Sequence, residues 1–142
     1  MKLKHADITD AVIGLFYHVY RTLGYGFLEK VYGNAMALAG RKIGLEILQE
    51  EPIRVYFEGS VVGKYEADLI VNGAVIAELK ACKNLAQEHE AQLLNYLKAS
   101  RFEVGLLLNF GPAPQFKRMI YDNEKKGSLS WLKKELDTDE HG

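Results

Sequence analysis

The sequence predicts one globular domain of the α/β or α+β class. Its 142 residues, of which 48% are hydrophobic and 26% charged, have the balance of an ordinary single domain. A chain of this size buries about 70% of the surface of its unfolded state, so one hydrophobic core can stabilise it without disulfides or a structural metal. Helical periodicity near the N-terminus is followed by alternating, strand-like patterns, which indicates that helices and strands both contribute to this core.

Two amphipathic helices are expected in the first 42 residues. Apolar side chains recur at steps of three and four over residues 8–23, which predicts a helix that Asp7 or Thr9 can cap. Gly24 ends this helix, and a second one is expected over residues 27–42.

The following residues show strand patterns. Pro52 opens a segment in which apolar and polar side chains alternate up to a turn at Gly59-Ser60. An apolar run typical of a buried strand occurs later in the chain. The further expected strands cover residues 61–71, 74–81, 104–109 and 116–121.

Helical spacing returns over residues 88–100, and a short terminal helix is expected over residues 129–136. Residues 137–142 form a polar tail that we expect to fray. Residues 1–142 contain no repeat, linker or low-complexity stretch, so we expect a single domain.

The two strands that flank Asn72-Gly73 carry charges that a purely structural hairpin would not need. Odd positions of both strands are apolar, whereas even positions include Asp68, Glu78 and Lys80. A two-residue Asn-Gly turn would put Asp68 and Glu78 on opposite faces of the sheet. A three-residue loop, residues 71–73 with Gly73 in the left-handed region, would put them on one face. Because burial sets register more strongly than turn preference, we expect this loop, with Asp68 opposite Ile76.

Asp68 and Glu78 would then be neighbours of like charge. Such carboxylates repel, and a divalent cation between them removes the repulsion, since Mg²⁺ takes carboxylate oxygens as ligands. Lys80 lies two residues, about 6 to 7 Å, along the strand from Glu78 and could hold a water or a phosphate oxygen. The alternative is a solvated strand face with alternating charges, which many antiparallel sheets show. Spacing alone leaves both interpretations open.

Five segments of the chain together resemble one protein family. Asp68 followed by Glu78-Leu79-Lys80 matches the PD-(D/E)xK nuclease superfamily, although Ala67 stands where the motif has proline. The chain resembles more closely the GxxExxY proteins, whose name describes Gly26, Glu29 and Tyr32. The segments that follow the family's order and spacing are residues 23–29, 67–71, 78–81, 92–97 and 105–111.

This resemblance implies an α/β fold with a restriction-endonuclease-like core, in which a mixed β-sheet is flanked by helices. It also implies a Mg²⁺ or Mn²⁺ site held by Asp68, Glu78 and the carbonyl of Leu79. In that family Lys80 would position the attacking water. Glu29 matches an additional acid on the first helix of the core, which acts through a water or a second metal ion.

The resemblance adds residues that would contact the substrate. Gln92 and Tyr96, four residues apart on one side of a helix, are similar to a Gln-xxx-Tyr motif that supports substrate binding in RecB-like nucleases. Tyr32, which the family name describes, and Lys83, which forms a basic spot with Lys80, complete the residues expected to contact the substrate. Plainer interpretations remain: the tyrosines could be core aromatics, Gln92 could cap a buried carbonyl, and Glu29 could be a helix N-terminal acid.

The charge balance limits how a nucleic acid could bind. With a net charge of -1, the protein as a whole does not attract a polyanion, so binding must be local, at spots such as Lys80/Lys83 or Lys117/Arg118. The single cysteine excludes a disulfide framework, and no apolar run approaches the ~20 residues of a membrane span. Without a signal-peptide pattern either, we expect a cytoplasmic protein.

The expected function is hydrolysis of phosphodiester bonds in DNA or RNA by a nuclease that requires Mg²⁺ or Mn²⁺. The alternative is a non-catalytic module that keeps the fold and binds a nucleic acid or a protein. A third possibility is a subunit that needs a partner, either another protein or a second copy in a homodimer, to hold its substrate.

Overall fold

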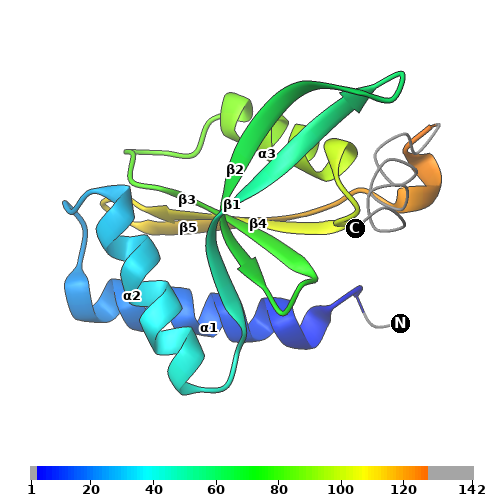
Figure 1. Cartoon of the computed structure of the whole chain (residues 1–142). Coiled ribbons are helices and arrows are strands. Elements are labelled where there is room, and N and C mark those ends of the chain that lie inside the picture. Colours follow the sequence, from blue (N-terminus) through cyan, green and yellow to red (C-terminus); the bar gives the residue numbers. More distant parts are fainter. Residues whose placement is uncertain (1–2, 128–142) are drawn as a thin grey trace.

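A five-stranded mixed sheet with helices on both faces organises the fold (Figure 1). The computed structural model describes residues 3–127. Helices α1 (Ala6–Leu23) and α2 (Glu29–Lys42) cover one face, and α3 (Gln87–Ala99) covers the other. The strands, in the order of both chain and sheet, are β1 (Ile47–Phe57), β2 (Ser60–Val71), β3 (Val75–Lys80), β4 (Val104–Phe110) and β5 (Pro114–Ile120). A 3₁₀ turn at Asn123–Lys125 follows.

Strands β3 and β4 form a parallel pair, and all other neighbours in the sheet are antiparallel. The connection between β3 and β4 runs through α3, as a parallel pair requires a crossover. Every residue of β4 is buried, because helices cover the sheet on both sides. The expected α/β fold with a mixed, helix-flanked sheet is therefore confirmed.

The sheet separates two apolar clusters. One fills the space between the sheet and the α1 and α2 helices, and the other lies under α3. The first includes Val12, Phe16, Tyr32, Met36, Leu69, Val71, Ala77, Leu79, Leu106 and Leu108, and the second includes Ile53, Ala67, Ile70, Ile76, Leu93, Tyr96, Leu97 and Leu107.

The three helices expected within the described part of the chain are confirmed, with shifted ends. Helix α1 begins two residues earlier than expected, so Asp7 and Thr9 lie inside its first turn and neither is the N-cap. Helix α2 begins at Glu29 rather than at residue 27, because residues 24–28 form a separate loop. The helix expected over residues 129–136 and the polar tail lie outside the described residues.

The largest error in the expected strands concerns β1. The strand begins at Ile47, five residues before Pro52, which lies inside it. Proline has no N–H to donate to a neighbouring strand, and it is tolerated here because β1 is an edge strand. The polar residues before Pro52 lack an alternating pattern, so the sequence did not indicate this part of the strand.

The hairpin between β2 and β3 has a three-residue loop but not the expected register. Val71 pairs with Val75, and Ile70 pairs with Ile76. The expected position of Asp68 opposite Ile76 is therefore wrong, and the strands are shifted by two residues from the predicted register. Because side chains alternate with a period of two, this even shift keeps odd residues opposite odd residues and even residues opposite even ones. Asp68 and Glu78 therefore still share one face of the hairpin.

The loop of this hairpin consists of Asn72, Gly73 and Ala74. Asn72 (φ 51°) and Gly73 (φ 61°) are both left-handed, whereas the prediction placed only Gly73 there. The N–H of Asn72 donates to the Glu46 carbonyl at 2.8 Å, and the Glu46 N–H donates to Asn72 Oδ1 at 2.8 Å. This contact comes from the residue before β1, which is why a local turn rule does not predict it.

Replacing Gly73 by alanine is expected to lower the free energy of unfolding by about 1 kcal/mol, because its φ of 61° is unfavourable for a residue with a Cβ. Gly14→Ala is the matched control. Gly14 lies inside α1 with open space at its Cβ position, so alanine there should stabilise the fold by up to about 1 kcal/mol. Urea denaturation of the two variants measures both effects. A stabilising effect at Gly73 would contradict the left-handed loop.

No helix within residues 3–127 has the length and apolar character needed to cross a membrane.

Candidate functional site

Strands β2 and β3 separate from one another partway along the sheet. They pair only from Leu69 to Val71 and from Val75 to Ala77. The part of β2 that precedes Leu69 pairs with β1 alone. This β1–β2 hairpin rises away from the sheet on the side of α3 (Figure 1). We call the point of separation, at Asp68 and Glu78, the fork.

At the fork, the side-chain carboxylates of the two acids accept hydrogen bonds from backbone N–H groups of the facing strand. The Asp68 N–H donates to Glu78 Oε1 at 3.2 Å. The Leu79 N–H donates to Asp68 Oδ2 at 2.8 Å. The two acids are therefore brought together, although by a different register from the predicted one.

Glu78 is buried, with 4% of its surface exposed. Burial, the negative charge of Asp68 and a hydrogen bond to that carboxylate raise the pKa of Glu78 from 4.5 to about 9. In the absence of a cation, the pair of acids therefore keeps a proton at neutral pH. The alternative of a solvated strand face with alternating charges is wrong at Glu78, because α3 covers this side of β3.

Lys80 and two residues of α3 lie beside Glu78. Lys80 Nζ donates to Gln92 Oε1 at 3.0 Å. Tyr96 is buried, and burial together with the charges of Glu78 and Asp68 raises its pKa to about 12, so its hydroxyl stays protonated. The structure thus gathers Gln92 and Tyr96 on the Lys80 side of the fork.

Glu29 lies on the other side of the fork. As the first residue of α2, it lines a cavity of about 180 Å³ together with Asp68 and Leu79. Besides Gly33, four polar or charged residues that were not predicted as site residues line this cavity. They are Lys30, Asn34, Gln49 and Glu50.

These additional residues join α2 to β1. Gln49 Nε2 donates to Asn34 Oδ1 at 2.9 Å, and the Lys30 ammonium lies 3.4 Å from the Glu50 carboxylate. The polar run at residues 49–51 shows no strand pattern, so nothing local places it next to the fork. Only the pairing of β1 with β2 brings it there.

A larger open cavity of about 800 Å³ adjoins the first one. Glu29 and Lys30 line both cavities. The larger one is also lined by Lys83, which is exposed and follows β3. The expected basic residue therefore lies at the rim of this cavity rather than at the fork itself.

Asn109 fixes the loop that carries Lys83. Its fully buried side chain accepts from the Cys82 N–H at 3.0 Å and donates to the Cys82 carbonyl at 2.9 Å. It also donates to Gln115 Oε1 at 3.2 Å, which accepts from the Leu85 N–H. The sequence signal was an amide inside the apolar run of β4, where a buried polar side chain needs partners.

Tyr32 does not occupy the substrate-contacting position that the resemblance implied. It is fully buried, and its ring stacks on Phe110 with centroids 4.0 Å apart. Its hydroxyl donates to the Gly24 carbonyl at 2.6 Å and accepts from the Phe27 N–H at 3.2 Å. The plainer interpretation, a core aromatic, describes this residue, and its effect on the site is to hold residues 24–28.

The oxygen atoms at the fork suit a hard divalent cation. Asp68 and Glu78 provide carboxylate ligands, and a cation would replace the proton that the buried pair otherwise keeps. Within residues 3–127, no three His, Cys, Asp or Glu side chains are grouped closely enough to hold a metal ion. Glu29 is therefore not grouped with Asp68 and Glu78 as a third side-chain ligand, and other oxygen donors would complete the coordination.

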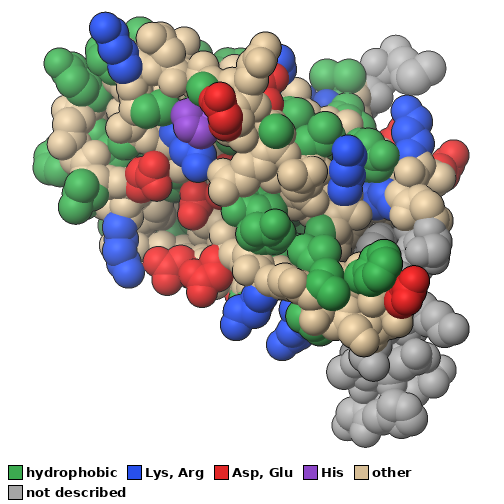
Figure 2. Space-filling model, turned by 90° about the horizontal axis from the view of Figure 1, so that it is seen from above, with side chains coloured by type: hydrophobic (Ala, Val, Ile, Leu, Met, Phe, Trp, Pro, Cys, Tyr) green, Lys and Arg blue, Asp and Glu red, His purple; other side chains and the backbone are tan. Residues whose placement is uncertain are grey.

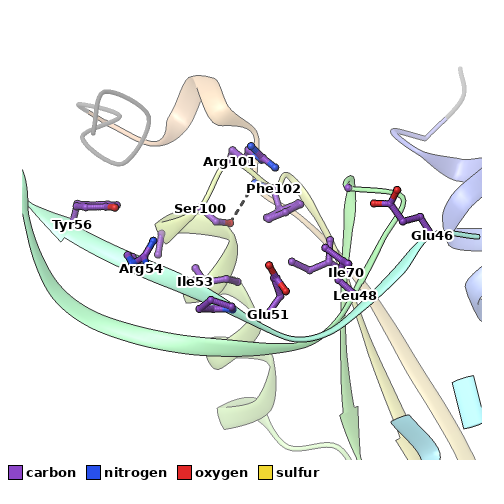
Figure 3. A pocket seen from close by; sticks show the side chains of 13 residues that line it. Glu46, Leu48, Glu51, Ile53, Arg54, Tyr56, Ile70, Ser100, Arg101 and Phe102 are labelled. Atoms are coloured by element: carbon purple, nitrogen blue, oxygen red, sulfur yellow. Dashed lines mark hydrogen bonds between the residues drawn. The ribbon is translucent and has the colours of Figure 1, made fainter. Parts of the chain in front are cut away.

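A separate cavity of about 250 Å³ lies between the β1–β2 hairpin and the end of α3 (Figure 3). Its lining includes Glu51, Arg54, Tyr56, Arg101 and Phe102. None of the residues predicted for the site lines it, so the fork and its two adjoining cavities remain the candidate functional site.

The surface of the protein shows no broad basic area on the face seen in Figure 2. The basic side chains there are scattered among acidic and hydrophobic ones. This distribution fits the net charge of -1 and supports the expectation that a nucleic acid would have to be recognised by local contacts.

Comparison with protein families matches residues 6–119 to the PD-(D/E)XK nuclease superfamily. Among solved structures, SSO0001 has a TM-score of 0.53 at 16% identity, covering 80% of this chain and 59% of SSO0001. The alkaline exonuclease LHK-Exo from Laribacter hongkongensis has a TM-score of 0.41 at 11% identity, covering 98% of this chain and 85% of the exonuclease. None of the curated proteins matches significantly.

The family match extends from α1 into β5 and includes every residue of the fork. The chain spans less than two thirds of the length of SSO0001, and at this identity the likeness shows the fold alone. The matched region contains almost the whole mixed sheet and both acids of the fork, as expected for a member of this superfamily. The chain therefore belongs to the PD-(D/E)XK nuclease superfamily.

Proposed function

We propose that this protein is a divalent-metal-dependent nuclease that hydrolyses phosphodiester bonds of DNA or RNA. The observation that carries the proposal is the fork, where Asp68 and Glu78 share hydrogen bonds beside Lys80. Membership of a nuclease superfamily supports it, and nucleases of this superfamily generally use divalent metal ions. The closer resemblance to GxxExxY proteins is part of the same proposal.

The two acids and one backbone carbonyl would hold Mg²⁺ or Mn²⁺. The ligands are Asp68, Glu78 and the Leu79 carbonyl, and the Leu79 backbone is fixed by its N–H bond to Asp68. A divalent cation there supplies Lewis-acid stabilisation of the phosphate. Glu29, which lines the same cavity as Asp68, would act through water rather than by direct ligation.

Lys80 would orient the attacking water or stabilise charge on the phosphate. One of its ammonium protons is directed to Gln92 Oε1, which leaves two donors for a substrate or water. Tyr96 offers a neutral hydroxyl donor on the same side, since its raised pKa keeps it protonated. Lys83 would bind a backbone phosphate at the rim of the larger cavity.

Lys80→Ala is expected to reduce hydrolysis about 100-fold or more, because it removes a donor that acts on the attacking water or the transition state. The measurement is cleavage of single- and double-stranded DNA and RNA with Mg²⁺, Mn²⁺ or EDTA. Lys64→Ala, an exposed lysine on β2, is the matched control and should cleave like the wild type. The Lys80 variant should keep the metal-induced rise in melting temperature, because Lys80 is not a ligand.

A non-catalytic binding module is the second candidate function. It is favoured by the lack, within residues 3–127, of a third acidic, His or Cys side chain grouped with the two acids. The same panel decides between the two. If the wild type cleaves no substrate with either metal but binds a nucleic acid or a protein, the module is the correct function.

A further inference from the structure

The loop between α1 and α2 carries an exposed apolar surface beside the fork. We propose that Tyr25 and Phe27 form a stacking platform for unpaired bases, so that the preferred substrate is single-stranded where it is cut. This inference rests on the proposed nuclease function, because it uses the position of the loop relative to the candidate catalytic site. We call residues 24–28 the platform loop.

Three apolar side chains of the platform loop are exposed to solvent. Tyr25 is 61% exposed, Phe27 46% and Leu28 80%. Single exposed apolar residues are normal in folded proteins, but these three are neighbours and line one cavity of about 800 Å³. Contiguous apolar surface at the edge of a cavity indicates a binding site.

The platform loop is held in one conformation by the core. The Tyr32 hydroxyl binds both the Gly24 carbonyl and the Phe27 N–H, while the Tyr32 ring stacks on Phe110. Gly24 (φ 69°) and Gly26 (φ 114°) supply backbone angles that other residues rarely adopt. The aromatic rings are therefore presented by a preorganised backbone, which reduces the entropy lost when a ligand binds.

The platform loop continues directly into the candidate catalytic site. Glu29 follows it in sequence and lines both the large cavity and the smaller cavity that contains Asp68. Lys30 and Lys83 also line the large cavity, so positive side chains lie next to the aromatic ones. In Figure 1 this loop lies at the same end of the sheet as the connection from β3 to α3.

Aromatic rings next to lysines match the chemistry of a single strand. Bases stack on Tyr and Phe rings, while the lysines contact the phosphates. In a duplex the base faces are already stacked on one another and cannot reach the rings. The net charge of -1 leaves no general attraction for a duplex backbone, which makes the local platform the main source of affinity.

Binding to a 12-nucleotide single strand and to its duplex, measured by fluorescence anisotropy in EDTA, tests the platform. Tyr25→Ala and Phe27→Ala should each weaken single-strand binding about tenfold and change duplex binding less than about twofold. Tyr25→Trp should bind like the wild type, because it keeps an aromatic face. Phe57→Ala is the matched control, since Phe57 is 63% exposed at the distant β1–β2 turn.

A single strand that contains 2-aminopurine gives a direct signal of stacking. Its fluorescence should be quenched by the wild type and by Tyr25→Trp, and much less by the Tyr25→Ala/Phe27→Ala double variant. Equal losses for single strand and duplex, unchanged affinity in both alanine variants, or no nucleic-acid binding at all would overturn the platform.

The two proposals fail in different ways. If the wild type cleaves nucleic acid while the alanine variants bind and cleave like it, the nuclease function stands and the platform falls. If no substrate is cleaved but single-strand binding depends on the aromatic rings, the platform stands as a binding site, and the nuclease function falls together with the preference at the cut.

Discussion

Mn²⁺ is expected to raise the melting temperature of the wild-type protein, and Asp68→Asn and Glu78→Gln are each expected to abolish this rise. Each change removes one carboxylate charge from the fork and keeps the size of the side chain, so the cation loses a ligand. In the wild type, a cation at 100 times its dissociation constant would stabilise the fold by about 2.7 kcal/mol. Thermal unfolding across a Mn²⁺ titration measures the effect.

The same two variants should lose hydrolysis by more than the roughly 10- to 100-fold that removal of an outer-shell residue typically causes. Glu66→Gln is the matched control, because Glu66 is an exposed acid on the same strand as Asp68. It should keep both the metal response and the activity. Equal metal-induced shifts in the wild type and both fork variants would remove the metal site from the proposal.

Without a divalent cation, the wild type is expected to lose stability relative to Glu78→Gln as the pH rises from 4.5 to about 9. The folded state raises the pKa of Glu78 between these values, so over this range it retains a proton that the unfolded chain releases. The stabilising contribution of this group is therefore fully present below pH 4.5 and is lost as the pH rises through about 9.

The size of this effect is on the order of several kcal/mol, since one pKa unit corresponds to about 1.4 kcal/mol. Glutamine at position 78 stays uncharged at every pH and resembles the protonated acid, so the difference between the two proteins isolates the group. Urea denaturation in EDTA at about pH 5, 7 and 9 measures it. Parallel stability curves would show that Glu78 ionises freely, whereas Mg²⁺ should reduce the wild-type loss at the highest pH.

Elements whose pattern depends on local spacing could be predicted from the sequence. The apolar periodicity over residues 8–23 identifies α1, and the unbroken apolar run at residues 104–109 identifies β4 as a buried strand. Both patterns directly reflect which side chains must leave water. Ends of elements were less accurate, as at β1, where the polar residues before Pro52 carry no alternation.

The sequence associates the residues of the fork with one another, but it does not give their geometry. Alternation along the hairpin associates Asp68 with Glu78, and the spacing to Lys80 completes the motif. The depth of burial that raises the pKa of Glu78 depends on α3, which is contributed from a later part of the chain. No local pattern in the sequence indicates that a helix will cover a strand face that carries charged residues.

Alternation and periodicity in the sequence predict a domain of helices and strands and one hairpin face that carries Asp68, Glu78 and Lys80, because these patterns encode which faces are buried. The mixed sheet of a restriction-endonuclease-like core was implied by the family resemblance. The register of the hairpin, whose Asn72 bonds to Glu46, and the burial of Tyr32 depend on contacts between elements that are distant in the chain. The tertiary structure also brought Glu29, Gln92 and Gln49 from three separate elements to the fork. Such contacts join residues far apart in the chain, and their geometry is set by the packing of whole elements rather than by local spacing.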